Sequence, residues 1–173
     1  MKTNFQKVAA MNIAFGNPSK QDIQQVISQS LNIADELGEL FIAFGVDPVY
    51  LRIAISHLKA EMRLIDPAKL NIDLVRDALT DIQVFTYGAQ HILGVDGDTD
   101  MDTTINNVMT RFIKDEADEQ ATIAMHAAKG VTQVYFEGAY PTKVMKSLVD
   151  QPDAPKGKFL KSASHKVSPF SPL

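Results

Sequence analysis

Two carboxylates of segment 35–40 (DELGEL) have the spacing of neighbours on one side of a helix. Successive residues of an α-helix are rotated by about 100°, so Glu36 and Glu39 are separated by about 60° and point to the same side. Most of the other positions in and around this segment are apolar, among them Leu31 and Phe41. We therefore expect a largely buried helix that carries paired acids on an inner face.

A second acidic face is predicted further along the chain. Asp73, Asp77 and Asp81 follow one another at four-residue intervals, so their direction on a helix drifts by only about 40° per step. Apolar residues fill most of the other positions up to Ile92, and Gly88 returns to the acidic face two turns after Asp81, where it leaves room for a ligand. This helix is also expected to lie inside a bundle.

Carboxylates on the inner face of a bundle must be paired, protonated or bound to cations, because burying a bare charge costs free energy. Four carboxylates from two helices, Glu36, Glu39, Asp77 and Asp81, would form an oxygen-rich site for Mg²⁺, or for Mn²⁺. A metal held there could bridge phosphate oxygens and activate a water molecule. The alternative, in which the acids lie on solvated helix faces and at helix caps, is the common fate of such pairs and stays open.

Other kinds of site have little support in the sequence. The chain has no cysteine, which excludes disulfides, thiolate metal ligands and cysteine nucleophiles. A calcium loop starting at Asp98 would need glycine and glutamate where Thr103 and Met109 stand. Zinc is disfavoured because the histidines lack ligand spacing; they are His57, His91, His126 and His165.

The composition is that of a soluble globular chain. Of 173 residues, 45% are hydrophobic and 22% charged, which excludes wholesale disorder. No run approaches the ~20 apolar residues of a membrane span, and the first residues do not resemble a signal peptide. We therefore expect a cytoplasmic protein that does not bind membranes.

Charge is unevenly distributed along the chain. Residues 1–140 hold 11 Lys and Arg against 19 Asp and Glu, whereas residues 141–173 hold six lysines against two acids. The acidic part makes a poor surface for duplex nucleic acid, which is not expected as a partner. The basic segment is expected to fold back on the acidic part.

Helix signals divide residues 1–140. Gly16, Gly45, Gly94 and Gly130 each follow an apolar periodic segment and are predicted to end a helix. The predicted helix starts include a serine cap at Ser19 and aspartate caps at Asp47 and Asp66, each directly before a proline. The expected helices lie at about 4–15, 19–45, 48–65, 73–93 and 104–129, with a loop at 95–102.

The predicted fold class is all-α, a bundle of four to five helices. Val131–Phe136 is the single plausible strand, and one short strand does not make a sheet. Residues 1–140 form the helical domain, and residues 141–173 form a basic, proline-containing, extended C-terminal arm. Helices that are apolar on several sides favour a homo-oligomer, a dimer or a tetramer.

Five segments of the chain carry a resemblance to a known family when taken in order: 5–16 (FQKVAAMNIAFG), 35–40 (DELGEL), 77–88 (DALTDIQVFTYG), 94–96 (GVD) and 157–162 (GKFLKS). This ordered set resembles the all-α NTP pyrophosphatase superfamily, whose branches include MazG-like, dimeric dUTPase-like and phosphoribosyl-ATP pyrophosphohydrolase-like proteins. The similarity covers about two thirds of the chain.

The resemblance implies an enzyme that hydrolyses a nucleoside triphosphate between the α and β phosphates. It implies Glu36, Glu39, Asp77 and Asp81 as Mg²⁺ ligands, with Glu36 and Glu39 also counted as catalytic. Asp35 would be an outer-shell group or a base. The spacing between the two acidic segments is longer here than is usual in the superfamily.

The resemblance also implies cations that contact phosphate. The superfamily often has an Asn-x-Ser-Lys element on the later helix, of which Lys114 keeps the lysine, with Arg111 nearby. Lys158 and Lys161 of the C-terminal arm are the other candidates. The simpler alternatives are pairing of Arg111 and Lys114 with neighbouring acids on the helix surface, and solvated lysines in the arm.

The sequence thus predicts a Mg²⁺-dependent nucleoside triphosphate pyrophosphohydrolase that releases pyrophosphate and a nucleoside monophosphate. A metal-activated water molecule would attack the α-phosphorus. The alternative is a non-catalytic helical interaction module without a metal site.

Overall fold

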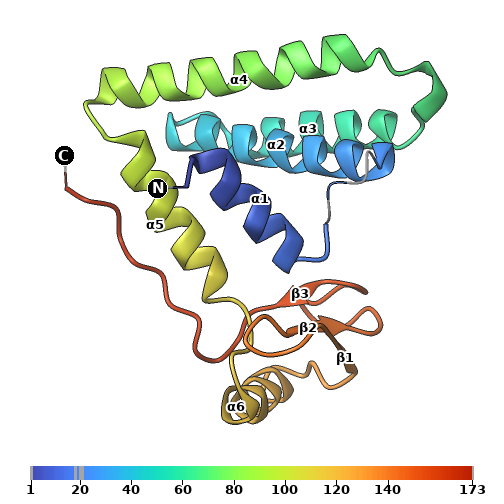
Figure 1. Cartoon of the computed structure of the whole chain (residues 1–173). Helices are drawn as coiled ribbons and strands as arrows, with labels where there is room; N and C mark the ends of the chain where they lie inside the picture. Colours follow the sequence, from blue (N-terminus) through green and yellow to red (C-terminus); the bar gives the residue numbers. More distant parts are fainter. Residues whose placement is uncertain (1, 18, 20–21, 173) are drawn as a thin grey trace. The chain divides into compact units, whose positions relative to one another are not determined.

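The computed structural model describes residues 2–17, 19 and 22–172, and within these ranges the chain is mainly helical, as expected (Figure 1). The helices are α1 (Asn4–Ala14), α2 (Ile23–Ala43), α3 (Pro48–Met62), α4 (Ile72–Leu93), α5 (Gly97–Met109) and α6 (Glu116–Ala127), with the short 3₁₀ helix η1 (Pro67–Lys69). Three strands follow, β1 (Val134–Glu137), β2 (Val144–Ser147) and β3 (Phe159–Leu160).

The chain divides into two compact units. The helical unit is residues 17–85, which contain α2, α3 and most of α4. The mixed unit is residues 1–16 and 86–173, which contain α1, the end of α4, α5, α6 and the sheet. Residues 141–173 thus fold together with residues 86–140 in the mixed unit.

Aspartate side chains begin several of the helices. Asp22 accepts hydrogen bonds from the backbone N–H groups of Gln24 and Gln25, at the start of α2. The expected cap at Ser19 is therefore wrong, because the residue directly before the helix already satisfies two of its free N–H groups. The caps at Asp47 and Asp66, each before a proline, are confirmed.

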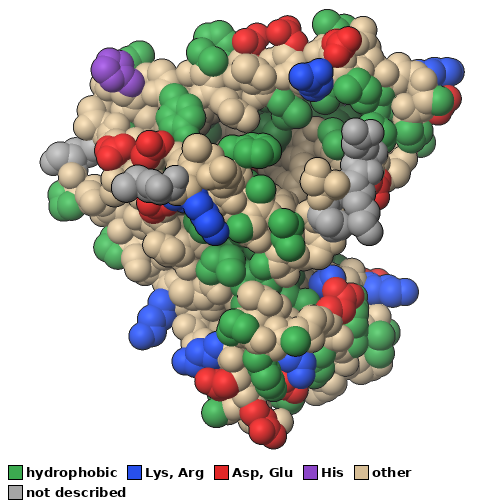
Figure 2. Space-filling model, in the orientation of Figure 1, with side chains coloured by type: hydrophobic (Ala, Val, Ile, Leu, Met, Phe, Trp, Pro, Cys, Tyr) green, Lys and Arg blue, Asp and Glu red, His purple; other side chains and the backbone are tan. Residues whose placement is uncertain are grey.

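The helical unit has a small interior. Gly38 of α2 is buried against α3, where a Cβ atom would overlap the Ile55 Cδ1. Among the described residues of this unit, Ile27 and Gly38 are the ones that are fully buried. Large apolar side chains remain at its surface (Figure 2), including Leu40, Phe41, Phe44, Ile53, Leu58, Leu74, Ile82 and Phe85.

The long helix expected at 104–129 is wrong, because the chain leaves the helix between α5 and α6. Phe112 and Ile113 are buried there, and the Ile113 N–H donates to the Lys143 carbonyl at 2.9 Å. Asp115 then caps α6 by accepting from the Asp118 N–H. The loop expected at 95–102 is likewise wrong, because Asp96 accepts from the Asp98 N–H and starts α5.

A three-stranded antiparallel sheet makes the all-α prediction too narrow. The strand expected at 131–136 overlaps β1, whose Phe136 is the register partner of Met145 in β2. Met145 in turn lies opposite Leu160 of β3. The core of the mixed unit is formed by Ile113, Val131, Met145, Ala154 and Leu160. The strands that complete the sheet come from the segment expected to be an arm.

The segment after β3 is held along α5 and α6 by polar contacts. The Ser162 hydroxyl donates to the Thr110 carbonyl at 2.9 Å, and the Ser164 hydroxyl donates to the Asp118 carboxylate at 2.8 Å. The Ser168 N–H donates to the Asn107 side-chain oxygen at 2.8 Å. This part of the arm has a defined place within the mixed unit.

Candidate functional site

The two glutamates of α2 lie on its solvated side. Relative to Gly38, which faces α3, Glu39 is rotated by about 100° and Glu36 by about 160°. Both side chains are exposed. Burial of most of this helix was expected and is wrong for the single chain, but the two acids share a face that is open to a ligand.

The aspartates of α4 also lie on an exposed face. Asp77 and Asp81 are exposed, whereas Val75 and Leu79, on the opposite side of the helix, are half-buried. Asp73 approaches Arg76 at 3.7 Å in an exposed ion pair. Such a pair contributes little to stability, since water screens both charges.

The acids of the predicted metal site are not gathered into one group in the structure of the single chain. Among the residues that it describes, no three His, Asp or Glu side chains lie together in a group that could hold a metal ion. Glu36 and Glu39 on α2, and Asp77 and Asp81 on α4, are therefore two separate acidic faces within one chain. A four-carboxylate site for Mg²⁺ stays a prediction.

Asp35 is engaged with the neighbouring helix. Its Oδ2 atom accepts from the Lys59 Nζ of α3 at 2.5 Å, and both side chains are partly shielded from solvent. This ion pair joins α2 to α3 one turn before Gly38. Asp35 thus helps to fix the orientation of the helix that carries Glu36 and Glu39.

The surface pairing considered for Arg111 and Lys114 does not occur. The Asp118 carboxylate accepts from the Lys114 backbone N–H and from Ser164 instead. Within the described ranges, neither cationic side chain forms an ion pair, and the buried Arg111 Nε has no acceptor.

The two lysines predicted in the arm line one cavity of the mixed unit. Its volume is about 520 Å³, and its wall includes Lys158, Lys161, His126, Lys129 and His165. The Lys158 Nζ donates to the backbone carbonyl of Asp153 at 2.5 Å. Nothing in the sequence connects these lysines with the two histidines or with Lys129, because only the fold brings residues 126–129 beside residues 158–165.

His165 lies in an electropositive part of this cavity. Its Nδ1 is 2.8 Å from the Thr110 hydroxyl, while its Nε2 is buried without a hydrogen-bond partner among the described residues. Partial burial lowers the pKa of His165, and the positive charges of Lys161 and Arg111 lower it further.

Comparisons of this chain with protein-family models, with curated proteins and with solved structures found no match. None of the described helices is both long and apolar enough to span a membrane.

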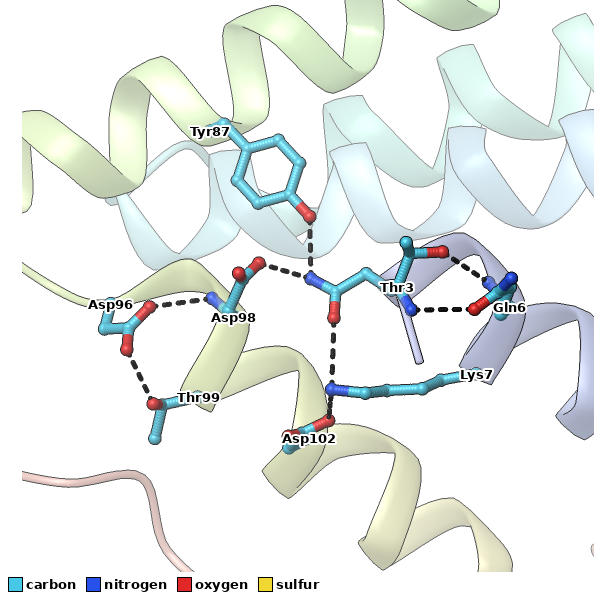
Figure 3. A network of polar contacts seen from close by, with 9 residues as sticks. Thr3, Gln6, Lys7, Tyr87, Asp96, Asp98, Thr99 and Asp102 are labelled. Carbon is cyan, nitrogen blue, oxygen red and sulfur yellow. Dashed lines mark hydrogen bonds and ion pairs between the residues drawn. The ribbon is translucent and has the colours of Figure 1, made fainter. Parts of the chain in front are cut away.

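A polar network connects α1, α5 and the end of α4 within the mixed unit (Figure 3). The Asn4 side-chain amide donates to the Tyr87 hydroxyl at 2.9 Å and to Asp98 at 2.6 Å, and Lys7 forms an ion pair with Asp102. The i, i+4 spacing of the two aspartates is the sequence signal for this role, which the loop interpretation of residues 95–102 missed. These acids hold elements together.

Two hydrogen bonds shift the pKa of Asp96 at the edge of this network. The Thr99 hydroxyl donates to its carboxylate at 2.7 Å, and the Asp98 N–H donates at 3.0 Å. Both bonds favour the ionised form and lower the pKa of Asp96. Asp96 is therefore a helix cap that stays charged.

Proposed function

We propose that this protein is a Mg²⁺-dependent nucleoside triphosphate pyrophosphohydrolase. The observation that carries the proposal is the orientation of α2, on which Glu36 and Glu39 share one exposed face while Gly38 packs against α3 and Asp35 pairs with Lys59 of α3. Two carboxylates held side by side on a positioned helix suit a hard divalent cation. The ordered resemblance to the all-α NTP pyrophosphatase superfamily supports the same residues.

In this proposal Glu36, Glu39, Asp77 and Asp81 would hold the metal. When bound, Mg²⁺ would lower the pKa of a water ligand and neutralise charge on the phosphate oxygens. Water would attack the α-phosphorus, and the bond from that phosphorus to the oxygen that bridges it to the β-phosphorus would break. The products are a nucleoside monophosphate and pyrophosphate. The resemblance implies Arg111 and Lys114 of the mixed unit as phosphate contacts, and neither side chain forms an ion pair within the described ranges.

The proposal includes association of identical chains. Among the described residues of the helical unit, Ile27 and Gly38 are the ones fully buried, and many large apolar side chains are exposed, as they are at protein interfaces. A second copy packed against these helices would give a homodimer or a homotetramer. Such packing would also surround the acidic faces with further protein and make metal binding there more favourable.

The test is a screen of the common ribo- and deoxyribonucleoside triphosphates with Mg²⁺ or Mn²⁺, in which released pyrophosphate is measured. We expect Glu39→Gln and Asp77→Asn to lower the rate at least about 100-fold, since each removes a metal ligand. Glu61→Gln, an exposed acid of α3, is the matched control and should keep the wild-type rate.

The alternative is a non-catalytic helical interaction module. The observation that favours it is the separation of the two acidic faces in the single chain, together with the exposed apolar side chains beside them. In this case no triphosphate would release pyrophosphate above the rate of a protein-free control, and Glu39→Gln would behave as the wild-type protein does.

A further inference from the structure

The cavity that contains Lys161 has a cationic rim and an apolar floor. Three lysines, Lys129, Lys158 and Lys161, lie around it, and Asp153 is the single acid among its lining residues. The floor includes Val131 and Leu160, which belong to the buried core of the mixed unit.

Among the described residues, none of the three lysines at this rim forms an ion pair with an acidic side chain. In the part of the chain that the structure describes, the ammonium groups of Lys129 and Lys161 have neither a hydrogen-bond nor an ion-pair partner. Lys158 gives one of its three donors to a backbone carbonyl, which anchors the side chain and leaves two donors for a ligand. Cations around a low-dielectric concave wall attract anions more strongly than scattered surface lysines do.

Two histidines add polar groups to the same wall. The His126 Nε2 lies 2.9 Å from the Lys161 carbonyl, which can only accept, so this ring nitrogen carries a hydrogen and the ring is oriented. The buried His165 Nε2 has no partner among the described residues. Leaving a buried polar atom of this kind unpaired is unfavourable, which favours a ligand or water molecule that can reach it.

The size and composition of the cavity limit the ligand. A volume of about 520 Å³ is within the range of small-molecule sites, which run from about 300 to 1,000 Å³. Inorganic phosphate would use the rim and leave the floor empty. A phosphorylated molecule with a planar or apolar group can use both.

From this geometry we propose that the cavity binds a phosphorylated small molecule, with its phosphate at Lys129 and Lys161 and its planar or apolar part against Val131 and Leu160. The site is built from the mixed unit alone and needs no metal. It therefore does not depend on the carboxylates of α2 and α4, and either proposal can fail without the other.

The test is titration of the full-length protein in EDTA with adenosine monophosphate, inorganic phosphate and pyrophosphate, followed by calorimetry and by NMR of the histidine rings. We expect saturable binding of the monophosphate, at least about tenfold tighter than inorganic phosphate, with chemical-shift changes at His126 and His165. The double variant Lys129→Gln/Lys161→Gln should weaken this binding at least about tenfold, because it removes both free ammonium groups.

Matched controls separate this site from general charge and from the carboxylates. Lys156→Gln removes an exposed lysine of the same unit outside the cavity and should leave the affinity within about twofold. Glu39→Gln should lose pyrophosphate release and keep monophosphate binding. Absence of saturable binding, or equal binding by the double variant, would overturn the proposal, and equal affinity for inorganic phosphate would overturn the role of the floor.

Discussion

Gly38 lies between Glu36 and Glu39 in the sequence of α2 and faces α3, where Ile55 approaches most closely. We predict that Gly38→Val lowers the free energy of unfolding by about 1–3 kcal/mol, because the larger side chain forces the two helices apart. In Gly38→Ala, the better helix propensity of alanine offsets the displacement of the flexible Ile55 side chain, so a much smaller change is expected. Urea unfolding followed by circular dichroism measures both, and equal stability of Gly38→Val and the wild type would contradict this packing.

Glu119 of α6 provides a second test at the scale of single residues. The Lys143 Nζ and the Tyr140 hydroxyl each donate to its Oε2 at 2.6 Å, and both bonds lower the pKa of Glu119 below its ordinary value of 4.5. The same contact raises the pKa of Tyr140 to about 12. A carboxyl whose folded-state pKa is lowered stabilises the fold above pH 4.5, and this contribution is lost as the pH falls through the lowered value.

We therefore predict that Lys143→Met destabilises the protein at pH 7 and flattens the fall in stability below pH 4.5. The loss of a charge-assisted hydrogen bond corresponds to about 1–3 kcal/mol at neutral pH. Thermal unfolding between pH 3 and pH 7 measures the effect. Lys166→Met, a change at an exposed lysine, is the control and should follow the wild-type profile.

At the scale of elements, the placement of residues 161–168 depends on Asp118. This carboxylate is 6% exposed and accepts from the Lys114 N–H, the Ser164 N–H and the Ser164 hydroxyl. We predict that Asp118→Ala lowers stability by about 2–4 kcal/mol, because it leaves buried donors unpaired. Proteolysis should then cut the segment after residue 160 faster. Glu116→Ala, at an exposed acid of the same helix turn, should cost less than about 1 kcal/mol, and an equal loss in both variants would show that Asp118 has no special role.

Local signals were sufficient for some elements and not for others. The C-terminal ends of α2 and α4 and the caps at Asp47 and Asp66 follow from residues within a few positions of each boundary. The break between α5 and α6 does not, because residues 104–129 keep a helical pattern and the chain leaves the helix to pair Ile113 with Lys143. The short strands β2 and β3 were missed for the same reason, since their pairing partners are distant in sequence.

Local sequence signals were also insufficient to predict how the residues of the candidate site come together. The sequence placed Glu36 and Glu39 on one face of α2, and Asp77 and Asp81 on one face of α4, because helical periodicity decides both. It could not show whether the two faces meet, which depends on packing between elements and between chains. It also missed His126, Lys129 and His165, which reach the cavity of Lys161 only through the tertiary fold.

At the scale of the whole molecule, the exposed apolar side chains of the helical unit predict association. Phe44 is 78% exposed and Phe85 is 75% exposed, and both lie in a unit with almost no interior among its described residues. We expect analytical ultracentrifugation to show a dimer or a tetramer at micromolar concentration, and Phe85→Glu to shift it toward monomer. Phe5→Glu changes a phenylalanine that is equally exposed in the mixed unit and should leave the assembly intact. A monomeric wild-type protein would contradict this prediction.

Metal binding by the acids of α2 and α4 tests the central proposal most directly. Calorimetric titration of the wild-type protein with Mn²⁺, in the presence of a triphosphate that cannot be hydrolysed between its α and β phosphates, should show a saturable site that Mg²⁺ competes for. Glu39→Gln and Asp77→Asn should each weaken this binding at least about tenfold, while Glu61→Gln should not change it. Binding that is absent from the wild type, or equally strong in Glu39→Gln and Asp77→Asn, would contradict the proposal.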